Sequence, residues 1–201
     1  MGIILVSLYV SCEIIANVTA GRPVQLGSVV VPSAVFIYTL TFTLVDLIHE
    51  VYGRHGSRMV VYGAFLANLL LAVYSLLVIH LPAPGFFAES SAYETVFGST
   101  PRIVFASLTA YVVSSLVDVE VYHFWRSRVH RWKWSGVLVS NAVSTCVDSV
   151  LFISLAFYGT LPVLPLIKGQ YLIKMAITAA SLPLIYIPSF RSSMVKATTR
   201  P

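Results

Sequence analysis

The sequence predicts an all-α integral membrane protein, a single domain over residues 1–201 that forms a bundle of six transmembrane helices. Its 201 residues are 57% hydrophobic and 10% charged, whereas about 25% of residues are charged in a soluble domain. Six crossings of about 20 residues each, with short loops, use nearly the whole chain. Both cysteines lie in apolar runs, and no Cys-x-x-Cys pair is present. The composition therefore excludes a soluble catalytic domain and a secreted disulfide scaffold.

Six apolar stretches mark the expected helices. Runs such as LLLAVYSLLVI are continuously apolar, whereas the strands of a membrane β-barrel alternate between apolar and polar residues. The first stretch lacks a basic start and contains Glu13 and Asn17, so we interpret it as a helix and not as a signal peptide. The stretches cover about residues 2–20, 29–48, 59–81, 102–123, 134–158 and 165–188.

The basic residues predict the orientation. Nine of the 13 Lys and Arg residues fall in the loop after the second helix, the loop after the fourth helix and the C-terminal tail. Because cytoplasmic loops are enriched in Lys and Arg, we expect both termini in the cytoplasm and a multi-pass protein of the cell inner membrane. All three tryptophans lie within or directly beside the loop from Arg126 to Lys133. These charges form no continuous basic face, so we expect no nucleic-acid partner.

The longest outer connection, between the third and fourth helices, contains a helix-start pattern. Ser91 and Glu94 have the spacing of a capping box, and Gly98 follows as a stop signal. This pattern predicts one short surface helix in the loop.

Charged residues inside the apolar stretches carry most of the functional information. Each costs about 2.5 kcal/mol or more in hydrocarbon, so such residues face the bundle interior or a wet cavity. From the rise of 1.5 Å per residue, Glu13, Asp148 and Lys174 all lie roughly 18–21 Å from the cytoplasmic face. We expect these three in one layer, and Asp46 and Asp118 in a second layer nearer the cytoplasm. Asp46 is also close enough to its helix end to reach cytoplasmic water.

Further polar residues share helix faces with these charges. Positions three and four apart adjoin on a helix, and hydroxyl groups in such stripes either line a cavity or join helices. The stripes predict a substrate-binding site in the middle of the bundle, with these candidate residues: Glu13, Asn17, Asp46, Tyr111, Ser115, Asp118, Thr145, Asp148, Tyr171 and Lys174.

Catalytic and metal sites are not expected. No two of the five histidines share a helix face at metal-ligand spacing, and no G-x-S-x-G motif accompanies an intramembrane serine. We therefore expect no metal, no cofactor and no enzymatic activity.

Several segments together resemble the queuosine precursor transporters, a family also called putative vitamin uptake transporters. The run VPSAVFIYTLTFTLVDLIHEVYG is similar to the family's proline-led helix ending in Asp-x-x-x-Glu-x-Tyr-Gly. Further matches follow in the same order over roughly residues 17–187: FGSTPRIVFASLTAY, SSLVDVEVYHFWR, a basic loop with tryptophan, VDSVLFISLAFYGTLP and YLIKMAITAASLPLIY.

The resemblance implies a six-helix inner-membrane importer of 7-deazapurine precursors of a modified tRNA base, such as 7-cyano- or 7-aminomethyl-7-deazaguanine. Two positions depart from the family pattern, because Ser115 and Thr145 stand where amides are common. A hydroxyl cannot donate and accept with the fixed geometry of an amide. The residues that follow the pattern are Asp46, Glu50, Tyr52, Gly53, Arg102, Tyr111, Asp118, Asp148 and Lys174.

Other functions fit the same sequence. One is a six-helix subunit that captures a vitamin or nucleobase for an ATP-driven, energy-coupling module. Another is an intramembrane enzyme that uses Asp46 and Asp118 as an aspartyl pair, and a third is a structural scaffold. The sequence also leaves open a homo-oligomer and the driving force of transport. The expected partners are the lipid bilayer and a small deazapurine substrate.

Overall fold

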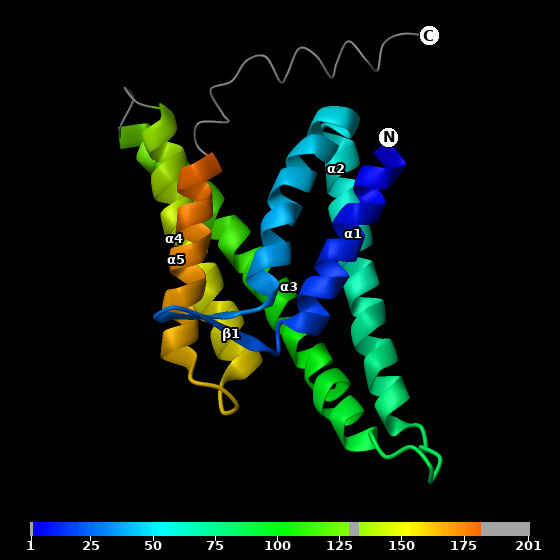
Figure 1. Ribbon diagram of the computed structural model, residues 1–201. Coiled ribbons are helices and arrows are strands. Elements are labelled where there is room, and N and C mark those ends of the chain that lie inside the picture. Colours follow the sequence, from blue (N-terminus) through cyan, green and yellow to red (C-terminus); the bar gives the residue numbers. More distant parts are fainter. Residues whose placement is uncertain (1, 129–132, 182–201) are drawn as a thin grey trace, which may run out of the picture.

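The computed structural model describes residues 2–128 and 133–181, and this part of the chain is mainly helical (Figure 1). A short antiparallel hairpin, β1–β2, lies between the first two helices and rests against the last one. The elements are α1 (Gly2–Thr19), β1 (Pro23–Leu26), β2 (Val29–Pro32), α2 (Ala34–His80), α3 (Ser90–Arg128), α4 (Lys133–Phe157) and α5 (Val163–Ser181).

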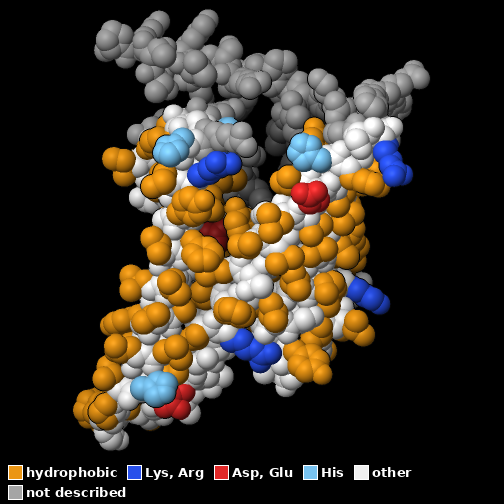
Figure 2. Space-filling view, turned by 180° about the vertical axis from the view of Figure 1, so that it is seen from behind, with side chains coloured by type: hydrophobic (Ala, Val, Ile, Leu, Met, Phe, Trp, Pro, Cys, Tyr) orange, Lys and Arg blue, Asp and Glu red, His pale blue; other side chains and the backbone are white. Residues whose placement is uncertain are grey.

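The helices have the length and composition of membrane spans. Within the described residues, four helical segments are long and apolar enough to cross a bilayer: Gly2–Thr19, His55–His80, Ser90–Trp125 and Leu138–Phe157. A shorter apolar helix covers Ala34–His49. Figure 2 shows hydrophobic side chains over most of the visible face, with histidine side chains near its ends and a few charged side chains scattered over it. The expected class, an all-α membrane protein, is confirmed, and the count of six crossings stays a prediction.

Helix α2 consists of two helical halves that meet at a sharp bend. Gly53, at the bend, has φ 68° and ψ −174°, a conformation that only glycine adopts without strain. The first half runs toward the end of the molecule that holds the start of α1, and the second half returns from it (Figure 1). We call this the amino-terminal end. The two halves correspond to the second and third predicted helices.

The predicted start of the second helix is wrong. Residues 29–32 form strand β2, and the helix begins at Ala34. Three consecutive valines favour a strand, and Gly27, with φ 60°, forms the turn of the hairpin. The backbone N–H of Ser33 donates to the carbonyl of Arg22 at 2.9 Å and closes the hairpin base. Periodicity cannot distinguish a short apolar strand from a helix start.

The predicted short surface helix is not a separate element. Helix α3 begins at Ser90 and continues through Gly98 and Pro101. Proline removes one backbone hydrogen bond, and neighbouring side chains compensate for such a loss in membrane helices. The Thr100 hydroxyl donates to the carbonyl of Val96 at 3.1 Å here. At the helix start, Ser90 and not Ser91 donates to the Glu94 carboxylate, at 3.1 Å.

Two apolar clusters hold the described bundle together. The larger one joins α1, the hairpin, the start of α2, α3, α4 and α5 around small buried residues such as Ala16, Ala20 and Ala106. The smaller one joins α1 to both halves of α2 through Tyr9, Ile48 and Ala64. Small residues allow close helix contact, and this packing drives helix association in lipid.

Candidate functional site

An ion pair between α4 and α5 lies inside the bundle. The Lys174 Nζ atom is 2.5 Å from Asp148 Oδ2, and the two side chains are 12% and 15% exposed. Removing an isolated charge from water costs several kcal/mol of free energy. A close, hydrogen-bonded partner of opposite charge offsets much of that cost. The structure thus joins two of the three charges that the sequence placed in one layer.

Glu13, the third charge of that layer, lies beside this pair on α1. It interacts electrostatically with Lys174 and with the side chain of Thr41, a buried residue of α2. Two carboxyl groups therefore lie near one ammonium group, and Asp148 is the one that pairs with it directly. Because Lys174 is bound closely by Asp148, Glu13 is the carboxylate with spare hydrogen-bond acceptors.

Tyr38 on α2 and Tyr111 on α3 complete this group. Lys174 Nζ lies 4.8 Å from the centroid of the Tyr38 ring, in the range of a cation–π contact. The electrostatic neighbours of Tyr38 include Glu13, Asp148 and Tyr111. We call Glu13, Tyr38, Tyr111, Asp148 and Lys174 the central cluster; one residue comes from each of the five helices.

Tyr38 and Thr41 are two residues of this region that the sequence did not predict as site residues. Both lie in an apolar run with several hydroxyl groups, YTLTFTLVD, so composition alone does not distinguish them from helix-joining residues. Tyr38 and Thr41 are three positions apart, which places both side chains on one helix face. This spacing is the feature of the sequence that could have predicted them.

A small deep cavity adjoins the central cluster. Its volume is about 30 Å³, which is room for a water molecule or two but not for a bicyclic ring. The lining combines Glu13, Tyr38 and Tyr111 with apolar, hydroxyl and amide side chains: Tyr9, Val61, Ala64, Phe65, Asn68, Ser107 and Leu108.

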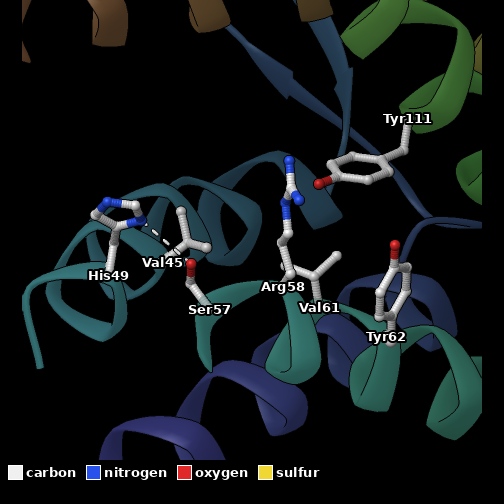
Figure 3. A pocket seen from close by; sticks show the side chains of 7 residues that line it. All are labelled: Val45, His49, Ser57, Arg58, Val61, Tyr62 and Tyr111. Carbon is white, nitrogen blue, oxygen red and sulfur yellow. Dashed lines mark hydrogen bonds between the residues drawn. The ribbon is translucent and has the colours of Figure 1, made fainter. Parts of the chain in front are cut away.

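A larger cavity lies toward the amino-terminal end, and we call it the vestibule. Its volume is about 330 Å³, and Val61 and Tyr111 line both this cavity and the deep one. Figure 2 shows a hollow near this end, with an acidic side chain deep inside and a basic side chain at the rim. Seven residues line the vestibule (Figure 3): Val45, His49, Ser57, Arg58, Val61, Tyr62 and Tyr111.

The bend at Gly53 shapes the vestibule. His49 comes from the first half of α2 and Ser57 from the second half, and His49 Nδ1 lies 3.2 Å from the Ser57 hydroxyl. This hydrogen bond, drawn in Figure 3, joins the two halves beside the bend. Without a glycine at the bend, these side chains would not face one cavity.

Asn17 is engaged in a contact between helices. Its side-chain amide donates to Asn68 Oδ1 on α2 at 2.7 Å, and the Asn68 amide donates to the carbonyl of Ala64 at 3.0 Å. Both asparagines are buried. Asn17 therefore stabilises the contact between α1 and α2 at the edge of the deep cavity.

The other predicted site residues lie around the central cluster. Asp118 on α3 accepts a hydrogen bond from the Ser144 hydroxyl on α4 at 3.1 Å, and Ser115 interacts with Tyr111. Thr145 and Tyr171 are partly buried on α4 and α5. Asp46 lies in α2, and its side chain is outside the described part, so its expected place in one layer with Asp118 stays a prediction.

The chemistry of this region is that of a binding site. Carboxylates can accept paired N–H groups, and tyrosine rings can stack on a planar ligand or donate to a carbonyl. In the described residues, no group of three or more His, Cys, Asp or Glu side chains has the geometry of a metal site.

Comparison with known proteins identifies similar transporters. The sequence matches the family described as "Putative vitamin uptake transporter" over residues 32–188. A "Probable queuosine precursor transporter" of Bacillus subtilis is 32% identical over 178 residues, which cover 85% of this chain and 77% of the relative. A protein of Haemophilus influenzae with the same name is 31% identical over 125 residues, 60% of this chain and 51% of the relative. No solved structure matches the chain.

Proposed function

Because this chain belongs to the putative vitamin uptake transporter family, we propose that it imports queuosine precursors across the cell inner membrane. The family consists of transporters and not of enzymes. The substrates that we propose are 7-deazaguanines, such as the 7-cyano and 7-aminomethyl compounds. The names of both relatives support this class of substrate.

The proposal is supported by the central cluster, which contains two acidic side chains and one basic side chain. Two carboxyl groups, Glu13 and Asp148, lie near the single ammonium group of Lys174, which pairs directly with Asp148. A guanine-like ring presents an N–H and an exocyclic NH₂ side by side, and one carboxylate accepts both. We propose that Glu13 binds this donor edge first and that Asp148 takes part once the ion pair opens.

The membrane arrangement that we propose has six crossings, with α5 and the two halves of α2 among them. The amino-terminal end then faces the cytoplasm, because it holds the N-terminus and the ends of α3 and α4 that flank the basic loop (Figure 1). Ser127, exposed near the end of α3, offers a test. In a variant with Cys12 and Cys146 replaced by alanine, a cysteine at Ser127 should resist a membrane-impermeant reagent added outside intact cells. Efficient labelling would reverse the orientation.

Uptake into liposomes tests the proposed activity. The purified protein, reconstituted without any other protein, should accumulate or equilibrate labelled 7-cyano-7-deazaguanine. Glu13→Gln replaces an acceptor by a donor and should weaken binding by about 1–3 kcal/mol, roughly 5- to 150-fold. Glu120→Gln is the matched control, because Glu120 is an exposed carboxylate on α3. Binding without uptake would favour a capture subunit of an ATP-driven module, and neither binding nor uptake would refute the proposal.

A further inference from the structure

Arg58 provides an available cationic group in the wall of the vestibule. It lies in the second half of α2, five residues after the bend at Gly53, and is exposed to the cavity. No hydrogen bond or ion pair joins it to the residues that the structure describes. Figure 3 shows its guanidinium group and the Tyr111 hydroxyl pointing toward one another. Arginine offers five N–H donors in one plane and no acceptor, so its preferred ligand is an acceptor group.

The size and lining of the vestibule suit a planar small molecule. Its volume of about 330 Å³ falls in the range of small-molecule sites, about 300–1,000 Å³. Tyr62 and Tyr111 are 62% and 41% exposed, so both rings are accessible for stacking. The deep cavity, at about 30 Å³, has no room for a bicyclic ring in this conformation, whereas the vestibule has.

The two cavities differ in charge. The deep cavity adjoins two carboxylates and one ammonium group, whereas Arg58 gives the vestibule a positive charge. A guanine-like ring has both a donor edge and a carbonyl acceptor. The carboxylates complement the first edge and a guanidinium group complements the second.

We propose that the vestibule is a second substrate site, in which Arg58 binds the carbonyl edge of a neutral, planar substrate and disfavours one that carries an ammonium group. This inference rests on the proposed function and deepens it. The substrate passes from the carboxylates of the central cluster, past Tyr111, to Arg58. Tyr111 separates the two sites because it lines both cavities, so its side chain must move during passage.

Two 7-deazaguanines that differ only in the substituent on ring atom C7 serve as probes. Comparing them separates the effect of substrate shape from that of substrate charge on recognition by Arg58. The nitrile of 7-cyano-7-deazaguanine is a neutral acceptor close to the ring carbonyl, whereas the aminomethyl compound carries an ammonium group at pH 7. A positive charge within about 7 Å of Arg58 is repelled by roughly tenfold or more in affinity in a partly wet cavity. Arg58 therefore determines specificity between the two probes.

The experiment measures initial uptake rates of both probes into liposomes that contain the full-length protein. In R58Q, the ratio of cyano to aminomethyl uptake should fall by about tenfold relative to the unsubstituted protein. R58K retains the charge without the planar donors, so it should transport the cyano compound more slowly and still disfavour the aminomethyl compound. R128Q is the matched control, because Arg128 is exposed at the end of α3, where it stacks on Phe124 at 4.5 Å, and does not line the vestibule.

The outcomes separate this inference from the proposed function. If the unsubstituted protein takes up neither probe, the proposed function fails and this inference fails with it. If it takes up the probes but R58Q leaves their ratio unchanged, the vestibule site is refuted and the proposed function stands. If R58Q does not fold, R58K decides: slower cyano uptake supports the site, and unchanged uptake of both probes overturns it.

Discussion

Replacing the two partners of the interior ion pair, singly and together, separates its structural role from substrate recognition. At 2.5 Å between Lys174 Nζ and Asp148 Oδ2 and an effective dielectric constant of about 20, the attraction is about 7 kcal/mol. Burying the two ions costs several kcal/mol each. These opposing terms nearly cancel, so the intact pair contributes little net stability.

The single variants should nevertheless be destabilised. Lys174→Met leaves Asp148, at 15% exposure, without its partner, at a cost of about 3–5 kcal/mol, whereas Asp148→Asn leaves Lys174 with Glu13 still nearby and should cost less. The double variant removes both charges and should recover the stability of the unsubstituted protein within about 1–2 kcal/mol. The free energy of unfolding is measured by titrating the detergent-solubilised protein with sodium dodecyl sulfate, with Glu120→Gln as an exposed control.

Transport should stay impaired in the double variant. An amide at position 148 offers one acceptor and one unwanted donor to the paired N–H groups of the substrate, a mismatch of about 1–3 kcal/mol. The assay is precursor uptake at limiting concentration in cells unable to synthesise deazapurines, read as modified tRNA with membrane expression checked in parallel. Near-normal tRNA modification would refute Asp148 as a recognition residue. If the double variant loses as much stability as the two single variants together, Asp148 and Lys174 are not energetically coupled, and the reasoning is refuted.

Three further substitutions test the packing around the site, with the free energy of unfolding as the measurement. Asn68→Leu should cost about 1–3 kcal/mol because it leaves the buried Asn17 amide without its acceptor, and adding Asn17→Leu should recover much of the loss. Arg102→Met removes two 2.7 Å hydrogen bonds to carbonyls at the end of α4 and should cost about 1.5–3 kcal/mol; an unchanged value would show that these bonds contribute nothing. Gly169→Ala places a methyl group against the backbone carbonyl of β2 and should loosen the hairpin, whereas Gly63→Ala, which meets open space, should be neutral or stabilising. Equal effects of the two glycine substitutions would contradict the close contact between hairpin and α5.

The sequence by itself determined the membrane class and predicted that the main charges lie at one level of the bundle. Apolar runs of about 20 residues require internally hydrogen-bonded helices in lipid, and a constant rise per residue converts position into depth. Glu13, Asp148 and Lys174 were therefore placed in one layer before any contact was known. Pattern alone also identified the family resemblance, which the comparisons confirm.

Only the tertiary structure decided which polar groups face one another. Asn17 shares a helix face with Glu13, yet it bonds Asn68, 51 positions away, because helix rotation follows from packing against neighbouring helices. Tyr38 enters the central cluster and Arg58 faces the vestibule for the same reason, although the sequence marked Arg58 only as a topology signal. The hairpin at residues 23–32 packs against α5, which is distant in sequence, and α3 continues through the stop expected at Gly98. Local pattern specifies the depth and type of a residue, whereas its partners depend on how the whole bundle packs.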